Sequence, residues 1–311
     1  MSDADQSLAV RAAWLHYTGG LTQAEVAKRL GLPSVKTHRL IARAVADGVV
    51  KITIDGDIVE CVELENRLSK RFGLQYCEVT PYLGDEESIF RTLGQAGADF
   101  LRREIEMGDN SVIGLGHGQT LSTAVQLLPR LNTRDVRFVS LLGGLTRDYA
   151  ANPYDVMHYI AEKTGMRAYV LPVPFFANTS EDREVLLAQR GVREIIDLAN
   201  RATLKFVGLG TVDTHAQLVR SGMIEAREIE DIAAAGGVGE ILGYFFDSNG
   251  RILETTLTAR TLSASLPQPS TGRLVAVAGG QRKIDAIRAV LRSRCLHGLI
   301  TDERTAEGLL Q

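Results

Sequence analysis

The hydrophobic and polar positions of residues 22–45 predict two short helices joined by a tight turn. Thr22 and Glu25 stand three positions apart, as the partners of a capping box do where a helix begins. Apolar residues then recur at helical spacing as far as Gly31, a residue type that commonly ends helices in the left-handed conformation. Pro33 suits the start of the second helix. The pattern predicts a helix-turn-helix.

The second of these helices has one apolar face and one polar, basic face. The expected buried stripe consists of Leu40, Ile41, Ala44 and Val45. A helix that enters the major groove needs short polar groups, a methyl group and flanking cations on its outer face. We expect this face to bind double-stranded operator DNA through Ser34, Val35, Lys36, Thr37, His38, Arg39 and Arg43.

Two flanking segments extend this unit. Residues 8–18 predict a further helix whose Trp14 and Leu15 cover the core, and residues 49–54 alternate apolar and polar side chains like a β-wing. The alternative is an ordinary helical hairpin with a solvated, charged face. Five basic residues against one acid between positions 20 and 45 favour a DNA-binding helix-turn-helix domain, residues 1–55.

The remainder of the chain predicts an α/β domain. Residues 56–74 form an amphipathic linker helix, for which pairing between subunits and packing on the same chain are both open. From about residue 75, short apolar strands alternate with helices, and most of the strands end in glycine. They are expected at 75–81, 111–116, 136–144, 167–175, 204–210 and 273–280. This alternation predicts a mostly parallel sheet covered on both faces, residues 75–311 forming the effector and oligomerisation domain.

Charge divides the chain in the same way. Residues 1–54 carry seven Lys or Arg and four acids, whereas the rest carries 28 bases and 34 acids, so a basic head precedes an acidic body. The three cysteines are scattered, and we expect neither a disulfide framework nor a metal site. The first residues lack the features of a signal peptide and no apolar run is long enough to span a membrane, so we expect a cytoplasmic protein.

A glycine turn, IGLGHGQTL, is the first candidate for ligand binding. It places Gly116, His117, Gly118, Gln119 and Thr120 between a strand and a helix, where free N–H groups bind phosphates or hydroxyls. The spacing departs from the dinucleotide pattern G-x-G-x-x-G, and no acid follows at about twenty residues, so we expect no nucleotide cofactor. Glycines that serve only a tight turn are the alternative.

Three charged residues accompany later glycine turns: Asp213, Glu240 and Lys283. A carboxylate beside such a turn binds sugar hydroxyls, and a lysine at a helix start places its ammonium over a bound anion. The alternatives are capping or surface roles for the acids and a solvated cation for the lysine. Together the groups suit a small hydroxylated molecule, with or without a phosphate, and not a large apolar one.

Nearly the whole chain resembles the SorC family of bacterial sugar-responsive transcription regulators, through its head and through VIGLGHGQTL, LLGG, GVGEILGYFFDSNG and AGGQRKIDAIRAVLRSRCLHGLITDERTAEGLL. The closing LITDERTAEGLL is the most specific of these elements. The resemblance implies a winged helix-turn-helix joined to a Rossmann-like domain of the phosphosugar-isomerase type. It also implies a homo-oligomer, a dimer or tetramer, that controls a carbohydrate or polyol operon in response to a sugar, polyol or sugar phosphate.

The resemblance also implies an effector pocket. Its residues are Gly116, His117, Gly118, Gln119, Thr120, Gly143, Gly144, Asn152, Asp213, Glu240 and Lys283. Leu142 stands where several family members have a basic residue, which argues against a doubly phosphorylated effector and against an imine. His117 replaces a small or aromatic residue. The leading interpretation is a short polyol or its monophosphate.

Two other functions remain open from the sequence. GLGTVDTHAQ faintly resembles the deaminase pattern GLG-x-DGH-x-A, and Asp213 and His215 would then act as acid and base in a phosphosugar isomerase or deaminase. Thr214 replaces the glycine between them, however, and we expect a regulator and not an enzyme. The third alternative is a constitutive DNA-binding protein whose body serves only to oligomerise; the polar glycine turns argue against it.

Overall fold

The computed structural model describes residues 3–47, 49–50, 59–131, 136–146, 154–267 and 272–311. Contacts divide the chain into two compact units, Met1–Gly56 and Asp57–Gln311. The helix expected as a linker falls within the second unit, as α4 (Val59–Phe72). The expected β-wing lies mostly outside the described residues, which include only Val49 and Val50 of it.

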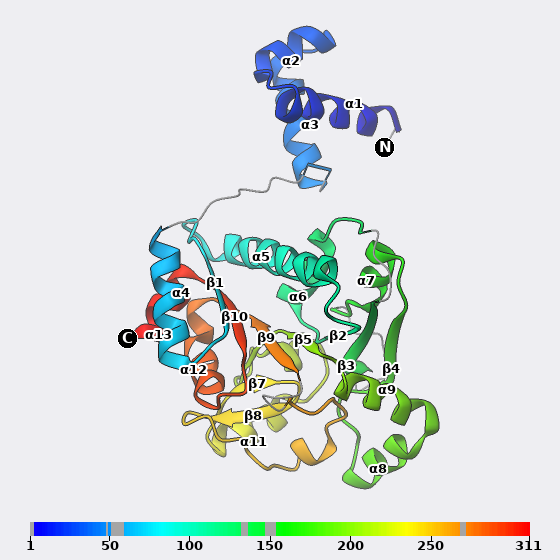
Figure 1. Ribbon diagram of the computed structural model, residues 1–311, viewed down its shortest axis with the longest axis vertical. Helices are drawn as coiled ribbons and strands as arrows, with labels where there is room; N and C mark the ends of the chain where they lie inside the picture. Colours follow the sequence, from blue (N-terminus) through cyan, green and yellow to red (C-terminus); the bar gives the residue numbers. More distant parts are fainter. Residues whose placement is uncertain (1–2, 48, 51–58, 132–135, 147–153, 268–271) are drawn as a thin grey trace. The chain divides into compact units, whose positions relative to one another are not determined.

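The N-terminal unit is a small helical unit (Figure 1) with a core of small apolar side chains. Its elements are α1 (Asp3–Ala13), the π-helical turn η1 (Trp14–Thr18), α2 (Gln23–Leu30) and α3 (Ser34–Ala46). The buried core consists of Ala9, Ala12, Ala13, Val26, Leu40, Ile41 and Ala44. Alanine at the contacts lets α1 approach α3 closely.

Two side chains expected in this core are exposed instead. Trp14 is 59% exposed and Val45 is 39% exposed, whereas Leu15 packs against the core as expected. Successive helical residues point about 100° apart, and in this turn Leu15 faces the core while its neighbour Trp14 points to solvent. Val45 likewise lies one position beyond Ala44, which is fully buried.

The turn between α2 and α3 follows the predicted chemistry. Glu25 N–H donates to Thr22 Oγ1 at 3.3 Å, and Thr22 N–H donates to Glu25 Oε2 at 2.7 Å, which completes the capping box. Gly31 ends α2 with φ of 63°, and Pro33 is the N-cap of α3. The helix-turn-helix prediction is confirmed in its two helices and its turn.

The second unit contains a seven-stranded parallel sheet and a three-stranded antiparallel one (Figure 1). The order of the parallel sheet is β1-β10-β9-β5-β2-β3-β4. Its strands are β1 (Tyr76–Thr80), β2 (Val112–Leu115), β3 (Arg137–Leu145), β4 (Ala168–Pro174), β5 (Leu204–Val207), β9 (Arg273–Val277) and β10 (Gly298–Asp302). The small sheet consists of β6 (Gly210–Thr211), β7 (Gly237–Ile241) and β8 (Tyr244–Asp247). The α/β prediction is confirmed, although β7, β8 and β10 were not expected.

Helices cover both faces of the parallel sheet. One face packs against α5 (Glu86–Met107), α6 (Gln119–Leu127) and α7 (Met157–Thr164). The other packs against α4, α9 (Arg190–Asn200), α12 (Ile284–Arg292) and α13 (Glu303–Leu310). Helices α10 (Gln217–Arg220) and α11 (Ala226–Ala234) contact β6 and β7 of the small sheet. Alternation along a strand produces the two cores: Ile113 belongs to the first and Val112 to the second.

Short elements complete this unit. They are α8 (Ser180–Ala188) and the 3₁₀ turns η2 (Thr258–Arg260) and η3 (Gln281–Lys283). The amphipathic pattern of residues 182–200 predicts one helix, but the structure has two there, α8 and α9. Gln189 between them has an extended backbone, with φ of −64° and ψ of 128°, which ends one helix and begins the next.

The strand order reverses direction between β2 and β5. Strands β3 and β4 follow β2 on one side, whereas β5 lies on its other side and leads on to β9 and β10. All seven strands are parallel, so the loops after β2, β5 and β9 emerge at one edge. Open α/β sheets bind ligands at such a reversal.

Candidate functional sites

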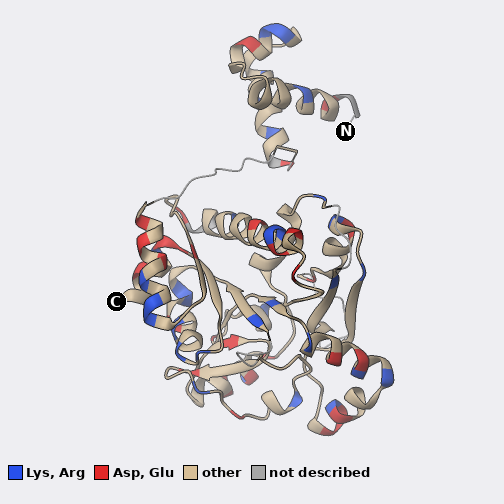
Figure 2. Cartoon of the chain, viewed as in Figure 1, with Lys and Arg blue, Asp and Glu red and all other residues tan. Residues whose placement is uncertain are grey.

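The outer face of α3 presents polar and basic side chains to solvent. Ser34, Lys36, His38 and Arg39 are exposed, and Val35 is 67% exposed. Lys and Arg lie on both α2 and α3 (Figure 2). Arg43 Nε lies 3.2 Å from Asp47 Oδ2 in a surface ion pair. This face has the mixture of short polar groups, a methyl-bearing side chain and cations that suits a major groove.

Thr37 does not lie on this face, so the prediction that its side chain contacts DNA is wrong. The residue is fully buried, and its hydroxyl donates to the Pro33 carbonyl at 3.2 Å. It precedes Leu40, Ile41 and Ala44 by three, four and seven positions, which places it on their buried stripe.

The loops after β2 and β5 lie against each other at the reversal. Gly116 N–H donates to the Phe206 carbonyl at 2.9 Å, and a Cβ on Gly116 would lie 3.3 Å from Val207 Cα. A Cβ on Gly208 would lie 3.1 Å from the His117 carbonyl. The close approach therefore brings together the glycine turn IGLGHGQTL after β2 and the glycine turn after β5, residues 207–211.

Helix α6 begins at this point without a side-chain cap. Gly118 precedes it with φ of 121°, a conformation that favours glycine, and no side chain of the described residues caps the helix. Gln119 is exposed, and Thr120 is buried. The first turn therefore directs N–H groups and the positive end of the helix dipole toward the loop edge.

Glu240 is buried beside Gly210, in the glycine turn after β5. Its Oε2 would lie only 2.7 Å from a Cβ on Gly210, and its Oε1 accepts the Gly243 N–H at 2.6 Å. Burial raises the pKa of Glu240 to about 7, although the Gly243 N–H and the Lys283 ammonium oppose the shift. The group can hold or release a proton near neutral pH, and it can accept a hydrogen bond from a hydroxyl.

Lys283 reaches the same place from the turn after β9. Its Nζ donates to the Leu209 carbonyl at 2.9 Å, one residue before Gly210. Burial lowers the pKa of Lys283, and the nearby Glu240 carboxylate opposes that shift. The structure thus brings two predicted residues, 43 positions apart in the sequence, to one edge of the small sheet.

His117 adds an uncharged ring to this edge. Burial lowers its pKa to about 4, which leaves the imidazole neutral at pH 7. Its ring meets Phe175 edge-on at 5.4 Å, and a Cβ on Gly243 would lie 3.2 Å from the same phenyl ring. Gly143 is connected to Phe175 through the backbone of Leu262. The Gly143 N–H donates to the Leu262 carbonyl, and the Leu262 N–H donates to the Phe175 carbonyl.

Three predicted residues are not brought into this cluster. Asp213 is exposed, and its Oδ1 accepts the His215 N–H at 2.7 Å within its own loop. Gly144 faces β4, with Val170 within 3.6 Å of its would-be Cβ. Asn152 lies outside the described residues.

Three contributors were not identified from the sequence: Leu209, Gly243 and Phe175. Leu209 contributes only a backbone carbonyl, so no side-chain pattern marks it. Gly243 and Phe175 meet each other across 68 positions of sequence. The spacing of Glu240 and Gly243, three residues across a hairpin turn, was the one available signal.

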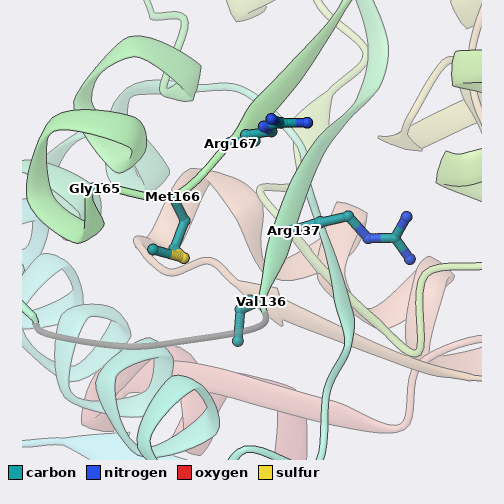
Figure 3. Close-up of a pocket in the computed structure, with 5 residues that line it drawn as sticks. All are labelled: Val136, Arg137, Gly165, Met166 and Arg167. Atoms are coloured by element: carbon teal, nitrogen blue, oxygen red, sulfur yellow. The ribbon is translucent and has the colours of Figure 1, made fainter.

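A hollow of about 450 Å³ lies at the opposite edge of the parallel sheet (Figure 3). Its lining residues are Val136, Arg137, Gly165, Met166 and Arg167, which stand where β3 and β4 begin. Met166 and Val136 point toward the same space, whereas Arg137 and Arg167 extend away from them. Ligands of open α/β sheets bind beyond the carboxyl ends of strands. We therefore place the candidate site at the glycine loops and not in this hollow.

Comparison with known proteins decides the family. The family model "Putative sugar-binding domain" matches residues 56–311. The erythritol catabolism regulatory protein EryD of Brucella abortus is 67% identical over 310 residues, which covers 100% of this chain and 98% of EryD. The transcriptional regulator LsrR of Klebsiella pneumoniae is 34% identical, covering 99% of this chain and 94% of LsrR. The chain belongs to the SorC family.

A solved structure of the same family agrees. Full-length sorbitol operon regulator SorC from Klebsiella pneumoniae superimposes with a TM-score of 0.71 at 27% identity, covering 99% of this chain and 100% of SorC. These SorC-family relatives and neighbours are transcriptional regulators, so this chain is a regulator and not an enzyme. Asp213 and His215, the candidates for catalysis, form the exposed loop turn described above.

Two absences hold for the described residues. No helix among them is long and apolar enough to cross a membrane. No group of three or more His, Cys, Asp or Glu in that part of the chain could hold a metal ion.

Proposed function

We propose that this SorC-family regulator binds operator DNA through α3 and responds to a short polyol or its monophosphate bound at the glycine loops. The observation that carries the proposal is 67% identity to a regulator of erythritol catabolism across essentially the whole chain. The site chemistry supports it. Glu240 can accept hydrogen bonds from hydroxyl groups. Lys283 and the start of α6 would attract a phosphate, and the neutral His117 ring adds no charge.

The effector regulates DNA affinity by binding one arrangement of the protein better than another. Coupling of this kind is typically worth about 1–3 kcal/mol, a change of about 5- to 150-fold in affinity. We further propose a dimer or tetramer, because helix-turn-helix proteins bind paired half-sites about one DNA turn apart. Such a protein acts where the operator is, in the cytoplasm. Light scattering that shows a monomer with full operator affinity would contradict the oligomer.

The test begins with an operator selected from random duplex by the wild-type protein. Erythritol, erythritol 4-phosphate and sorbitol are then titrated into the complex while anisotropy of labelled DNA is followed. We expect one of the two tetritols to change the affinity at least about fivefold. Failure to select any sequence contradicts DNA recognition. A selected operator that ignores all three compounds favours a constitutive DNA-binding protein.

Substitution at the glycine loops locates the effector. Lys283→Ala and Thr120→Ala should each raise the effector concentration needed for a half-maximal response by about tenfold, the loss of one charge-assisted hydrogen bond or one helix-start contact. Arg282→Ala is the matched control, because Arg282 is exposed on the same turn. A wild-type dose-response in both loop variants would move the pocket elsewhere.

A further inference from the structure

The first turn of α13 binds the loop that carries Lys283. Gly280 N–H is shared between two acceptors, Asp302 Oδ2 at 2.9 Å and Thr305 Oγ1 at 2.8 Å. The Thr305 hydroxyl in turn donates to Asp302 Oδ2 at 2.6 Å. Asp302 and Thr305 are both buried, at 1% and 0% exposure. We call these three residues the α13 clamp.

The clamp requires both glycines of the β9–α12 turn. A Cβ on Gly279 would lie 2.2 Å from Asp302 Oδ2, so the carboxylate occupies the space of a side chain. Gly280 has φ of 102°, a conformation that other residues rarely adopt. Asp302 is at the same time the N-cap of α13, because its Oδ1 accepts the Thr305 N–H at 3.0 Å. One carboxylate thus begins a helix and fixes a distant loop.

Only one turn of chain separates the clamp from Lys283. Lys283 N–H donates to the Gly280 carbonyl at 2.9 Å, so the 3₁₀ turn η3 transmits the position of Gly280 to the lysine backbone. The side chain then reaches the Leu209 carbonyl beside Glu240. Movement of Gly280 therefore displaces the ammonium from the effector loops.

We propose that Asp302 and Thr305 are positioning residues of the effector response, because they fix the loop from which Lys283 reaches the effector. The inference rests on the proposed function, in which Lys283 binds the effector. Asp302 and Thr305 act without contacting the effector in this proposal, since their side-chain oxygens bond to Gly280 and to each other. In this proposal the segment DERT, residues 302–305 at the junction of β10 and α13, positions Lys283 for the effector.

The chain offers a matched set of variants for the test. Thr305→Val removes the clamp hydroxyl, and Thr305→Ser retains it. Thr301→Val is the control, because Thr301 is equally buried on the adjoining strand but its hydroxyl has no hydrogen-bond partner among the described residues. Thr305→Val and Thr301→Val keep the shape of the side chain, but only the first removes a hydroxyl that bonds to Gly280 and Asp302. Thr305→Ser keeps that hydroxyl and removes only a methyl group.

The first measurement needs no effector. Hydrogen exchange of a peptide covering residues 279–287 should be about fivefold faster in full-length Thr305→Val than in wild type, because the hydroxyl that bonds to both Gly280 and Asp302 is lost. Thr305→Ser and Thr301→Val should exchange at the wild-type rate. Unchanged exchange in Thr305→Val would overturn the clamp, whatever the effector proves to be.

The second measurement is the dose-response to erythritol and erythritol 4-phosphate. Thr305→Val should raise the half-maximal concentration about fivefold, and the double variant with Lys283→Ala should be no worse than Lys283→Ala alone. Additive effects would show that Thr305 does not act through Lys283, and would overturn the inference. If Lys283→Ala itself has no effect, the proposed function fails at this site and the positioning role fails with it. If only Thr305→Val lacks an effect, the positioning role alone fails.

Discussion

The two units differ in the exposure of the charged side chains at their candidate sites. Lys36 and Arg39 on α3 are exposed and lie three positions apart. Glu240 is buried and Lys283 half-buried, and both meet groups far away in the sequence. Exposed cations act on DNA through a long-range field that salt screens. Buried charges instead cost desolvation and depend on each partner, so they recognise a specific small molecule. One chain thus combines a salt-sensitive surface with a pH-sensitive site.

The largest effect is expected for operator binding when the exposed cations of α3 are removed. Replacing Lys36 and Arg39 together with alanine should weaken operator binding about 100-fold, because two contacts with phosphate or base edges are lost. The slope of log affinity against log salt should also become shallower by about 2. Anisotropy titrations at several salt concentrations measure both.

Arg67→Ala with Lys70→Ala is the control for that experiment. Both residues are exposed cations of α4, in the second unit, so the variant has the same change in net charge. An equal loss of affinity in the control would mean that overall charge, and not the face of α3, determines operator binding.

The buried side of the contrast predicts a dependence on pH. The folded-state pKa of Glu240 is raised from 4.5 to about 7, so the folded protein binds this proton more tightly than the unfolded chain does. The resulting stability is complete below about pH 4.5 and is lost as the pH rises through 7. Glu240→Gln should remove about 2 kcal/mol from the fall in unfolding free energy between pH 5 and pH 8.

Urea denaturation followed by circular dichroism at both pH values measures this effect in the absence of effector. Glu230→Gln supplies the matched control, since Glu230 is exposed on α11 of the same unit. If Glu240→Gln retains the pH dependence of the wild type, another group carries it.

The smallest effect is expected within α3, where the buried Thr37 can be compared with the exposed Ser34. Thr37→Val should leave operator affinity within about twofold, because this side chain faces the core, but should cost the N-terminal unit about 1 kcal/mol through the lost hydrogen bond to Pro33. Trp14 is the one tryptophan of the chain, so its fluorescence during urea unfolding reports on this unit alone. Ser34→Ala, on the exposed face, should show the reverse pattern. A tenfold loss of affinity with unchanged stability would return Thr37 to the DNA-binding face.

Features that depend on neighbouring residues were predictable from the sequence. The Thr22 and Glu25 capping box, the left-handed Gly31 and the alternation of strand and helix all involve contacts within a few positions. Thr37 could have been assigned correctly from its spacing to Leu40 and Ile41. The glycine turns predicted which edge of the sheet carries the candidate site, because the carboxyl ends of parallel strands all lie at one edge.

Features that depend on distant pairing were not predictable. The glycine-rich stretch around Glu240 was taken as a turn, but its strands pair with each other and with β6. Lys283 was identified as a candidate, whereas its carbonyl partner at Leu209 was not, because only tertiary folding brings them together. The break at Gln189 divides a continuous amphipathic pattern, and no glycine or proline marks it.

The pairing of β1 with β10 has a consequence for how the protein is made. Strand β10 is the last strand among the described residues, and it separates β1 from β9 in the sheet. During translation the helix-turn-helix can fold soon after it leaves the ribosome, whereas the sheet must wait for the final residues. A frameshift shortly before Gly298 would therefore release a protein that keeps its DNA-binding helices and loses the means of switching them off or on.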